Sequence, residues 1–385
     1  MNKIIIGKFT KIFLGIIAVS TILICQPLEG QVVFGQPPTG EIKFIFQNWT
    51  LDDAEGEKTK LSQWVVPISA YIPISDNWEL TMTSSTAGSS VDPGGGSESS
   101  LSGLNDTRLM AYRSFMDDRI LLGAGINLPT GKKALDSSEV GVIGLLTESF
   151  LNMPIKNYGE GFGLNLEGGY VYNLDIYTFG AGLGYIIKGS FEPLEGTADY
   201  KPGNHLRLGA FASLRKDRFR GTISLVYNLF ARDKLGDTPV FKDGNMVDIW
   251  LNVGYTKDNI STNVGLREII RGKDERMISG VLEVEEAKSH GAETRFFGQI
   301  AYALNEKYSL KALLDYKYVA ANGYDDSKIR YFGSSNYFGI GLGGNAVFTE
   351  IFKGFAELEY FTGSADDGDV DMSGWEVVIG MGATF

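Results

Sequence analysis

The sequence predicts an all-β protein with one domain, a closed antiparallel transmembrane β-barrel. Three observations carry this prediction. Apolar residues alternate with small or polar residues over most of the chain, which is the period of a strand with two different faces. Short and long connections alternate between these segments. Glycine accounts for 49 residues and aromatic residues for 12% of the chain. Glycine weakens helices by about 1 kcal/mol relative to alanine, whereas aromatic side chains favour strands.

The N-terminal segment predicts a signal peptide that is removed on export. Three lysines precede an apolar run of 13 residues, 12–24, which is too short to span a membrane as a helix. Cleavage is expected after Gly35, with Gly30 as the alternative. Residues 1–35 are therefore assigned to the signal peptide. Residues 36–385 are assigned to the barrel, in the outer membrane of a Gram-negative-type bacterium.

The C-terminal segment shows the alternation most clearly. Trp375, Ile379 and Phe385 share the hydrophobic face of the predicted strand, while Glu376 lies with glycines and a threonine on the other face. The same pattern recurs along the chain and predicts about sixteen strands, with fourteen as the alternative. The strands are expected to start near residues 41, 61, 76, 103, 118, 161, 175, 203, 217, 243, 258, 290, 307, 331, 351 and 373.

The connections and the aromatic residues favour a membrane barrel over a soluble one. An even number of strands, with short periplasmic turns and longer extracellular loops, is typical of outer-membrane barrels. Outward-facing aromatic residues gather at both ends of the strands and bracket an aliphatic band, as two membrane interfaces require. A soluble all-β repeat protein such as a propeller is the alternative. It explains neither the aromatic residues at both ends of the strands nor the export signal.

Charge and composition limit the chemistry that this chain can perform. A net charge of −12 and a pI of about 4.8 argue against a nucleic-acid partner. One cysteine and two histidines leave little room for a metal site, so no cofactor or metal is expected. His205 and Ser213 raise the alternative of a hydrolase, but no spacing indicates a triad and we expect no enzyme. Gly339, Gly341 and Gly344 match a dinucleotide motif, yet more strand follows. Gly339, Gly341 and Gly343 repeat at period 2, which predicts a smooth inner wall.

The long loop at residues 130–160 contains a helix signal. Asp136 and Glu139 form a capping-box-like start, and apolar residues follow at partly helical spacing. We expect a short amphipathic helix inside this loop. A loop this long is usually functional, and two positions stay open: a lid on the rim or a plug folded into the lumen.

Each strand has two alternating sets of positions, one more hydrophobic than the other. Charged residues in the less hydrophobic set are expected to face the lumen, because charges within a membrane must face water or each other. A basic wall and an acidic wall are expected to lie opposite each other and to line a wet pore, since such a barrel is too wide for side chains to fill. Wall-bracing ion pairs without a transport role are the alternative. The basic wall comprises Arg207, Arg215, Arg267, Arg271, Arg295, Lys311 and Lys317. The acidic wall comprises Glu79, Asp106, Glu167, Glu357, Glu359 and Glu376.

Pro67 interrupts the second predicted strand. Proline cannot donate a hydrogen bond to a sheet, so it is found at an edge or a bulge, and a closed barrel has no edges. We therefore expect a bulge or kink at Pro67, beside a run of small residues on the third strand. Such a place could open laterally from the lumen to lipid. A harmless bulge is the alternative.

Four stretches carry a resemblance to a known family: LSGLNDTRL, GINLPTGKKAL, KNYGEGFGLNLEGGY and GAGLGYIIKGSFEPL, within residues 101–194. They resemble bacterial outer-membrane channels of the long-chain fatty acid and aromatic-hydrocarbon uptake superfamily. The resemblance implies a passive channel for hydrophobic small molecules, and a kinked early strand used as an exit. The best-known members have fourteen strands and an N-terminal plug. Here the first strand is expected near Glu41, which leaves little room for such a plug.

We therefore expect an outer-membrane channel for passive uptake of small hydrophobic or amphipathic solutes. A general diffusion porin and a structural or adhesive barrel are the alternatives. The expected partners are outer-membrane lipid and lipopolysaccharide, a small-molecule solute, and the barrel-assembly machinery. Phe385 is similar to the C-terminal aromatic residue that this machinery reads.

Overall fold

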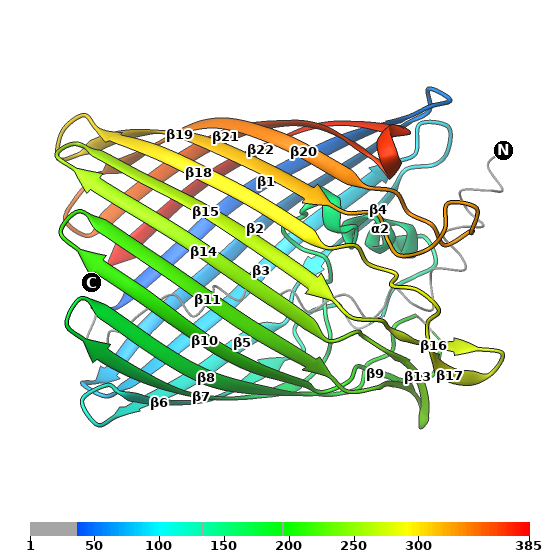
Figure 1. Cartoon of the computed structure of the whole chain (residues 1–385), viewed down its shortest axis with the longest axis horizontal. Helices are drawn as coiled ribbons and strands as arrows, with labels where there is room; N and C mark the ends of the chain where they lie inside the picture. Colours follow the sequence, from blue (N-terminus) through cyan, green and yellow to red (C-terminus); the bar gives the residue numbers. More distant parts are fainter. Residues whose placement is uncertain (1–36, 133, 195) are drawn as a thin grey trace.

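A computed structural model describes residues 37–132, 134–194 and 196–385, so the expected signal peptide lies outside the described residues. The described chain forms a barrel of tilted strands, with tight turns at the end that holds the C-terminus and long loops at the other (Figure 1). The wall strands are β1 (Thr39–Asp53), β2 (Lys58–Ser75), β3 (Trp78–Asp92), β4 (Ser99–Leu104), β5 (Thr107–Phe115), β6 (Ile120–Leu128), β7 (Gly163–Leu174), β8 (Tyr177–Lys188), β10 (His205–Lys216), β11 (Phe219–Phe230), β14 (Met246–Lys257), β15 (Ile260–Arg271), β18 (Glu293–Ala303), β19 (Tyr308–Val319), β20 (Ser335–Val347), β21 (Phe352–Ala365) and β22 (Val370–Thr384).

The wall is closed and antiparallel throughout. Each strand pairs with the next, and β1 pairs with β22 from Thr39↔Thr384 to Asp53↔Val370, which joins the two ends of the sheet. β4 and β5 both pair with β3 and are the two halves of one wall strand. The seventeen strands of the sheet therefore make sixteen wall strands. The prediction of sixteen strands is confirmed, and each begins within about four residues of its expected start.

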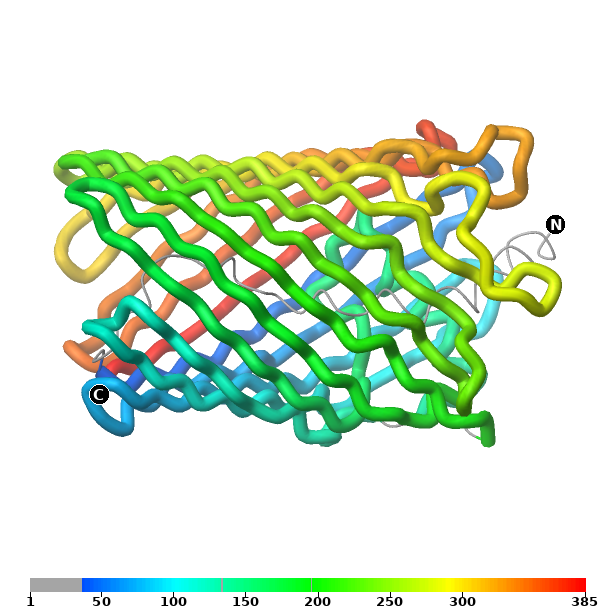
Figure 2. Tube along the Cα trace, turned by 60° about the horizontal axis from the view of Figure 1, so that its bottom comes forward, coloured from blue at the N-terminus to red at the C-terminus, as the bar shows by residue number. Residues whose placement is uncertain are grey.

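Side chains alternate between lipid and lumen as the sequence predicts. On β22, Trp375, Ile379 and Met381 are exposed on the outer surface, whereas Met372 on the opposite parity is buried. The tilted strands are continuous around the molecule in a second view (Figure 2). A sheet that crosses lipid must close because an open edge leaves backbone groups unsatisfied. Closure and the outward apolar band together make this an outer-membrane-type barrel.

Three long loops also pair with each other, which the sequence pattern did not predict. They build a second sheet in the order β17-β16-β13-β12-β9. We call it the rim sheet. Its strands have two to five residues each, too few for a period to be visible in the sequence. They are β9 (Tyr200–Lys201), β12 (Asp233–Leu235), β13 (Thr238–Lys242), β16 (Glu275–Ile278) and β17 (Val281–Val284).

Several glycines on the inner wall are covered by aromatic rings from neighbouring strands. The ring of Phe211 lies against Gly180, Phe297 against Gly265, and a Cβ added at Gly180 would lie 2.0 Å from Phe211 Cε1. At Gly339, an added Cβ would meet the Phe361 ring at 2.7 Å. The predicted smooth inner wall is therefore wrong at Gly339, where the glycine leaves the space that a cross-strand ring fills.

Gly180→Val should lower the stability of the barrel by about 1–3 kcal/mol, because its side chain overlaps the Phe211 ring. The temperature at which the folded band is lost on a heat-modifiability gel measures this effect. Gly254→Val is the matched control, since its added Cβ meets nothing closer than 3.7 Å. Equal midpoints for the two variants would contradict the packing role of Gly180.

Candidate functional site

The chain between β6 and β7 folds into the loop end of the barrel. It carries the helix α2 (Glu139–Leu146) and the short helix η1 (Ser149–Leu151). Val142, Leu146 and Leu151 are fully buried. They belong to one apolar cluster with inward-facing wall residues, among them Trp49, Leu61, Val65, Ala87, Leu101, Tyr337, Phe361 and Met372. The segment therefore packs against the inward face of the wall at the loop end of the barrel. We call residues 129–160 the inserted segment.

The start of α2 follows from its own sequence. The carboxylate of Asp136 accepts hydrogen bonds from the backbone N–H groups of Ser138, at 2.8 Å, and Glu139, at 3.1 Å. Glu139 in turn accepts one from the Asp136 N–H at 3.0 Å. This reciprocal pair satisfies backbone donors at the helix start. Glu139 also pairs with Lys132, which brings the entering chain close to the helix.

A glutamine from the wall clamps the inserted segment on one side. The side chain of Gln63 on β2 is 1% exposed. Its amide nitrogen donates to Ile155 O and its amide oxygen accepts from Ile155 N–H, both at 2.8 Å. Ser89 joins Gln63 to the hydroxyl of Tyr158, with both distances 2.8 Å. The clamp thus satisfies a half-buried backbone N–H and C=O of the segment.

Gln63→Leu should loosen the inserted segment, because it leaves the N–H and C=O of Ile155 without partners at a cost of about 1–3 kcal/mol. We expect faster protease cleavage within residues 129–160 while the barrel stays folded. Gln299→Leu is the control, since Gln299 is also inward but exposed on β18. Unchanged cleavage in Gln63→Leu would argue against the clamp.

Ionic contacts hold the opposite side of the inserted segment. Lys317 on β19 donates to the backbone O of Ser149 and pairs with Glu293 at 3.2 Å. Arg271 also pairs with Glu293 at 3.2 Å. Burial raises the pKa of Glu148 to about 7 and lowers that of Lys156 to about 8, and the neighbouring Lys317 charge adds to the lowering. Both loop residues therefore titrate near neutral pH.

A bulge in the fourth wall strand receives both ends of the inserted segment. Thr86 pairs with Leu104 while Thr83 pairs with Arg108, so one extra residue lies between β4 and β5. At this bulge, Asp106 accepts from the backbone N–H of Gly131 at 2.9 Å and of Glu160 at 2.6 Å. Asp106 thus binds the chain where the segment enters and leaves.

Five of the seven residues of the expected basic wall have acidic partners. Arg267 binds Asp248 through two hydrogen bonds of 3.0 and 2.6 Å. Arg295 binds Asp315 through three contacts of 2.6–3.1 Å. Lys311 pairs with Glu357 across β20. Arg271 and Lys317 share Glu293, as described above. Arg207 lies on the inward parity of β10, and Arg215 is exposed near the turn at the end of that strand.

The residues of the expected acidic wall differ in their contacts. Glu167 pairs with Arg108 at 2.6 Å and accepts from the Tyr112 hydroxyl at 3.0 Å. Glu79 is buried, and Glu357 is bound to Lys311. Glu359 lies directly opposite Glu376 in the ladder between β21 and β22. Of these pairs, Lys311–Glu357 alone joins a residue of the expected basic wall to one of the expected acidic wall, so the two walls meet there. That the two walls line a pore stays a prediction.

Pro67 interrupts the sheet on one side. The ladder between β2 and β3 runs through Pro67↔Ser85 without a shift, so the expected bulge is wrong there. The ladder with β1 stops at Ile42↔Ile68 and resumes at Ile45↔Val65 in the same register. In an antiparallel sheet the N–H and C=O of one residue face the same neighbour. Proline therefore breaks the pairing with β1 alone.

The contacts of His205 are those of a residue that supports the fold. Its Nε2 lies 2.9 Å from the side-chain oxygen of Asn228, and its ring stacks on Phe230 with centroids 4.6 Å apart. Ser213 is eight residues further along the same extended strand, β10, which places it about 26 Å away. That distance excludes a direct His205–Ser213 catalytic pair.

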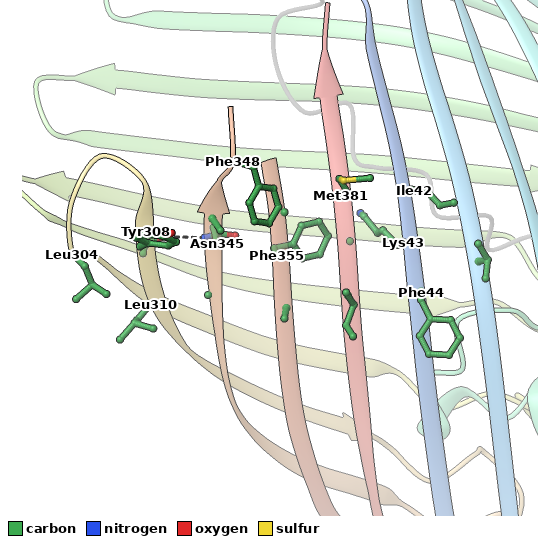
Figure 3. Close-up of a pocket in the computed structure, with 18 residues that line it drawn as sticks. Ile42, Lys43, Phe44, Leu304, Tyr308, Leu310, Asn345, Phe348, Phe355 and Met381 are labelled. Carbon is green, nitrogen blue, oxygen red and sulfur yellow. Dashed lines mark hydrogen bonds between the residues drawn. The ribbon is translucent and has the colours of Figure 1, made fainter. Parts of the chain in front are cut away.

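An apolar groove of about 760 Å³ lies on the wall formed by β19 to β22 and β1 (Figure 3). One hydrogen-bonded row across these strands reads Tyr308, Ala346, Gly354, Met381 and Ile42, and the next reads Leu310, Gly344, Ala356, Ile379 and Phe44. The large side chains of both rows are exposed on the lipid-facing side of the wall, and the small residues form the floor of the groove. The groove therefore opens toward lipid.

Three residues that help to hold the inserted segment were missed by sequence reasoning. Gln63, Ser89 and Glu293 are polar residues at inward positions, which is the signal that could have found them. Among the described residues, no three His, Cys, Asp or Glu side chains are arranged to hold a metal ion. The described chain also holds no helix of the length and apolarity that a membrane crossing requires.

No protein-family model matches this chain, and no curated protein matches it either. Solved structures of outer-membrane channels are similar in fold. A mutant of TodX, described as a monoaromatic hydrocarbon channel, has a TM-score of 0.47 at 11% identity, covering 91% of each chain. A FadL homologue of Pseudomonas aeruginosa has 0.43 at 9%, covering 91% of this chain and 90% of its own. OmpT of Vibrio cholerae, an outer-membrane protein, has 0.44 at 13%, covering 92% and 99%. Likenesses this weak identify no solute.

Proposed function

We propose that this protein is an outer-membrane channel for passive movement of small hydrophobic or amphipathic solutes, with the inserted segment as its plug. The position of that segment is the observation that supports the proposal. A barrel of sixteen strands is too wide for side chains to close. Here α2 and η1 fill part of the lumen. They form an apolar cluster with wall residues around Trp49 and Leu146, whereas other parts of the inner wall carry charged pairs. Such a lumen favours selective passage over an open pore.

A general diffusion porin is the second candidate. The inward ion pairs, such as Arg267–Asp248 and Arg295–Asp315, support it because charges at membrane depth indicate a wet lumen. In a porin the inserted segment would narrow the pore without closing it. The two candidates differ in whether small sugars pass as readily as apolar solutes.

Uptake into liposomes that contain the purified barrel tests the proposal. We expect a hydrophobic dye to enter much faster than into protein-free vesicles, and a small sugar to enter little faster. Barrel unfolded before reconstitution serves as the control. Rapid entry of the sugar would replace the proposed function with that of a general porin, and no entry of either would leave a structural or adhesive barrel.

Pro67→Val tests whether solutes leave through the wall. Valine restores the N–H that is missing from the ladder between β1 and β2. If the weak pairing there is the exit, dye uptake should fall several-fold while the conductance for ions is retained. Ile45→Val on β1 is a control of similar size outside the interruption. Equal dye uptake in both variants would leave Pro67 as a structural detail.

We also propose the partners that this location implies. Phe385 is 69% exposed at the turn end, and its N–H donates to Pro38 O at 2.9 Å, which holds the C-terminus beside β1. A presented terminal aromatic fits recognition by the barrel-assembly machinery. Outer-membrane lipid surrounds the apolar band.

A further inference from the structure

The rim sheet has one buried face and one exposed face. On the buried face, the hydroxyl of Tyr200 donates to Asp233, and Arg276 lies over the Phe241 ring at 5.5 Å. Phe241 is 1% exposed. Asp233 interacts electrostatically with Glu160 of the inserted segment. The buried face therefore packs against other residues of the loop end, and the exposed face is turned to the outside.

Basic residues dominate the exposed face. Lys201 on β9 lies directly opposite Lys234 on β12. Further along, Arg232 and Lys242 both pair with Glu275, at 2.8 and 3.2 Å. The exposed face thus carries four cations, of which two pair with Glu275, on a chain whose net charge is −12. We call Lys201, Arg232, Lys234 and Lys242 the basic rim patch.

The pair of lysines lacks a protein counter-charge. Like charges directly opposite in an antiparallel ladder destabilise it. Within residues 37–132, 134–194 and 196–385, neither Lys201 nor Lys234 forms an ion pair. An anion placed between the two ammonium groups would remove their repulsion, and phosphate oxygens are strong acceptors for such groups.

The surroundings of the patch indicate where that anion comes from. Met277 and Val284 lie on the same face of the rim sheet as Glu275 and are 38% and 60% exposed. The rim sheet lies at the loop end of the barrel, beyond the wall strands (Figure 1). A basic surface with apolar neighbours, facing outward above an apolar band, matches a membrane surface with anionic headgroups.

We propose that the basic rim patch binds the phosphate groups of an anionic glycolipid in the outer leaflet. Lys201 and Lys234 hold one phosphate between them, and Arg232 and Lys242 add positive charge from the neighbouring strands. Met277 and Val284 contact the apolar part of the same lipid. This inference rests on the membrane setting of the barrel and does not depend on what the channel carries.

Binding of diphosphoryl lipid A to the purified full-length barrel in a neutral detergent tests the proposal. Lys201→Glu/Lys234→Glu should weaken binding at least tenfold, whereas Lys201→Arg/Lys234→Arg should keep it. Lys257→Glu/Lys307→Glu is the matched control, because both lysines are exposed at the turn end of the barrel and the charge change is the same. Heat-modifiability shows that each variant is folded.

Three outcomes would overturn the proposal. Equal binding by the rim variant and the turn-end control would show that the patch is not the site. Equal binding of lipid A with and without its phosphates would remove the phosphate from the recognition. Binding of inorganic phosphate as tight as that of lipid A would make the patch a site for the free ion. Loss of lipid A binding in the rim variant alone, with weak binding of free phosphate, supports the lipid site.

Discussion

Deleting residues 133–156, with two glycines joining Lys132 to Asn157, should raise the single-channel conductance about tenfold, because a sixteen-stranded barrel without a plug leaves an aqueous channel. The join is sterically reasonable. Lys132 N–H donates to Tyr158 O at 3.1 Å, so the two ends of the deleted segment already lie side by side. Asp106 still binds Gly131 and Glu160 in the variant. Planar-bilayer recordings measure the change.

The control for this deletion is a full-length variant with the same two glycines inserted after Asn157. It should conduct as the unmodified protein does. Sugar permeation should rise with conductance in the deletion, and selectivity for the hydrophobic dye should fall. A conductance that stays at the level of the full-length protein would show that the inserted segment does not obstruct the lumen.

Asp315→Ala should destabilise the barrel by about 1–3 kcal/mol, the cost of removing the acceptor of a half-buried, hydrogen-bonded charge pair. Asp315 is 4% exposed and accepts from Arg295 and from the Tyr337 hydroxyl, the latter at 3.1 Å. Its removal leaves the guanidinium without a partner beside the apolar cluster. Denaturant unfolding in detergent micelles measures the free energy of unfolding.

Two further variants decide what causes that loss. Arg295→Met/Asp315→Leu should recover much of the stability, because no unpaired charge remains. Asp199→Ala, at an exposed loop position, should change little. If the double variant is as unstable as Asp315→Ala, the cost lies in lost packing and not in the isolated charge of Arg295.

Much of the fold is encoded locally and could therefore be predicted. The alternation along Trp375–Phe385 places each side chain on the lipid or the lumen side, because successive side chains of a strand point to opposite faces. The capping pattern of Asp136 and Glu139 likewise predicts a helix in the inserted segment, and the hydrogen bonds between these two residues confirm it. Both signals are complete within a few residues of sequence.

Contacts between distant residues could not be predicted in this way. Lys311 binds Glu357, so the two predicted walls meet there, and Arg295 binds Asp315 within one of them. Parity shows that all four side chains face the lumen. Which charges meet depends on the register between strands, and register is a property of pairs of strands.

The sequence by itself determined the strands, their two faces, the closed barrel and the helix in residues 130–160, since periodicity and capping act over short distances. Only the tertiary structure decided where that helix lies. Gln63 meets Ile155 across 92 residues and Lys317 meets Ser149 across 168, and no local pattern reports such contacts. The rim sheet has the same origin, because its short strands are stable only as part of a sheet that three separate loops build together.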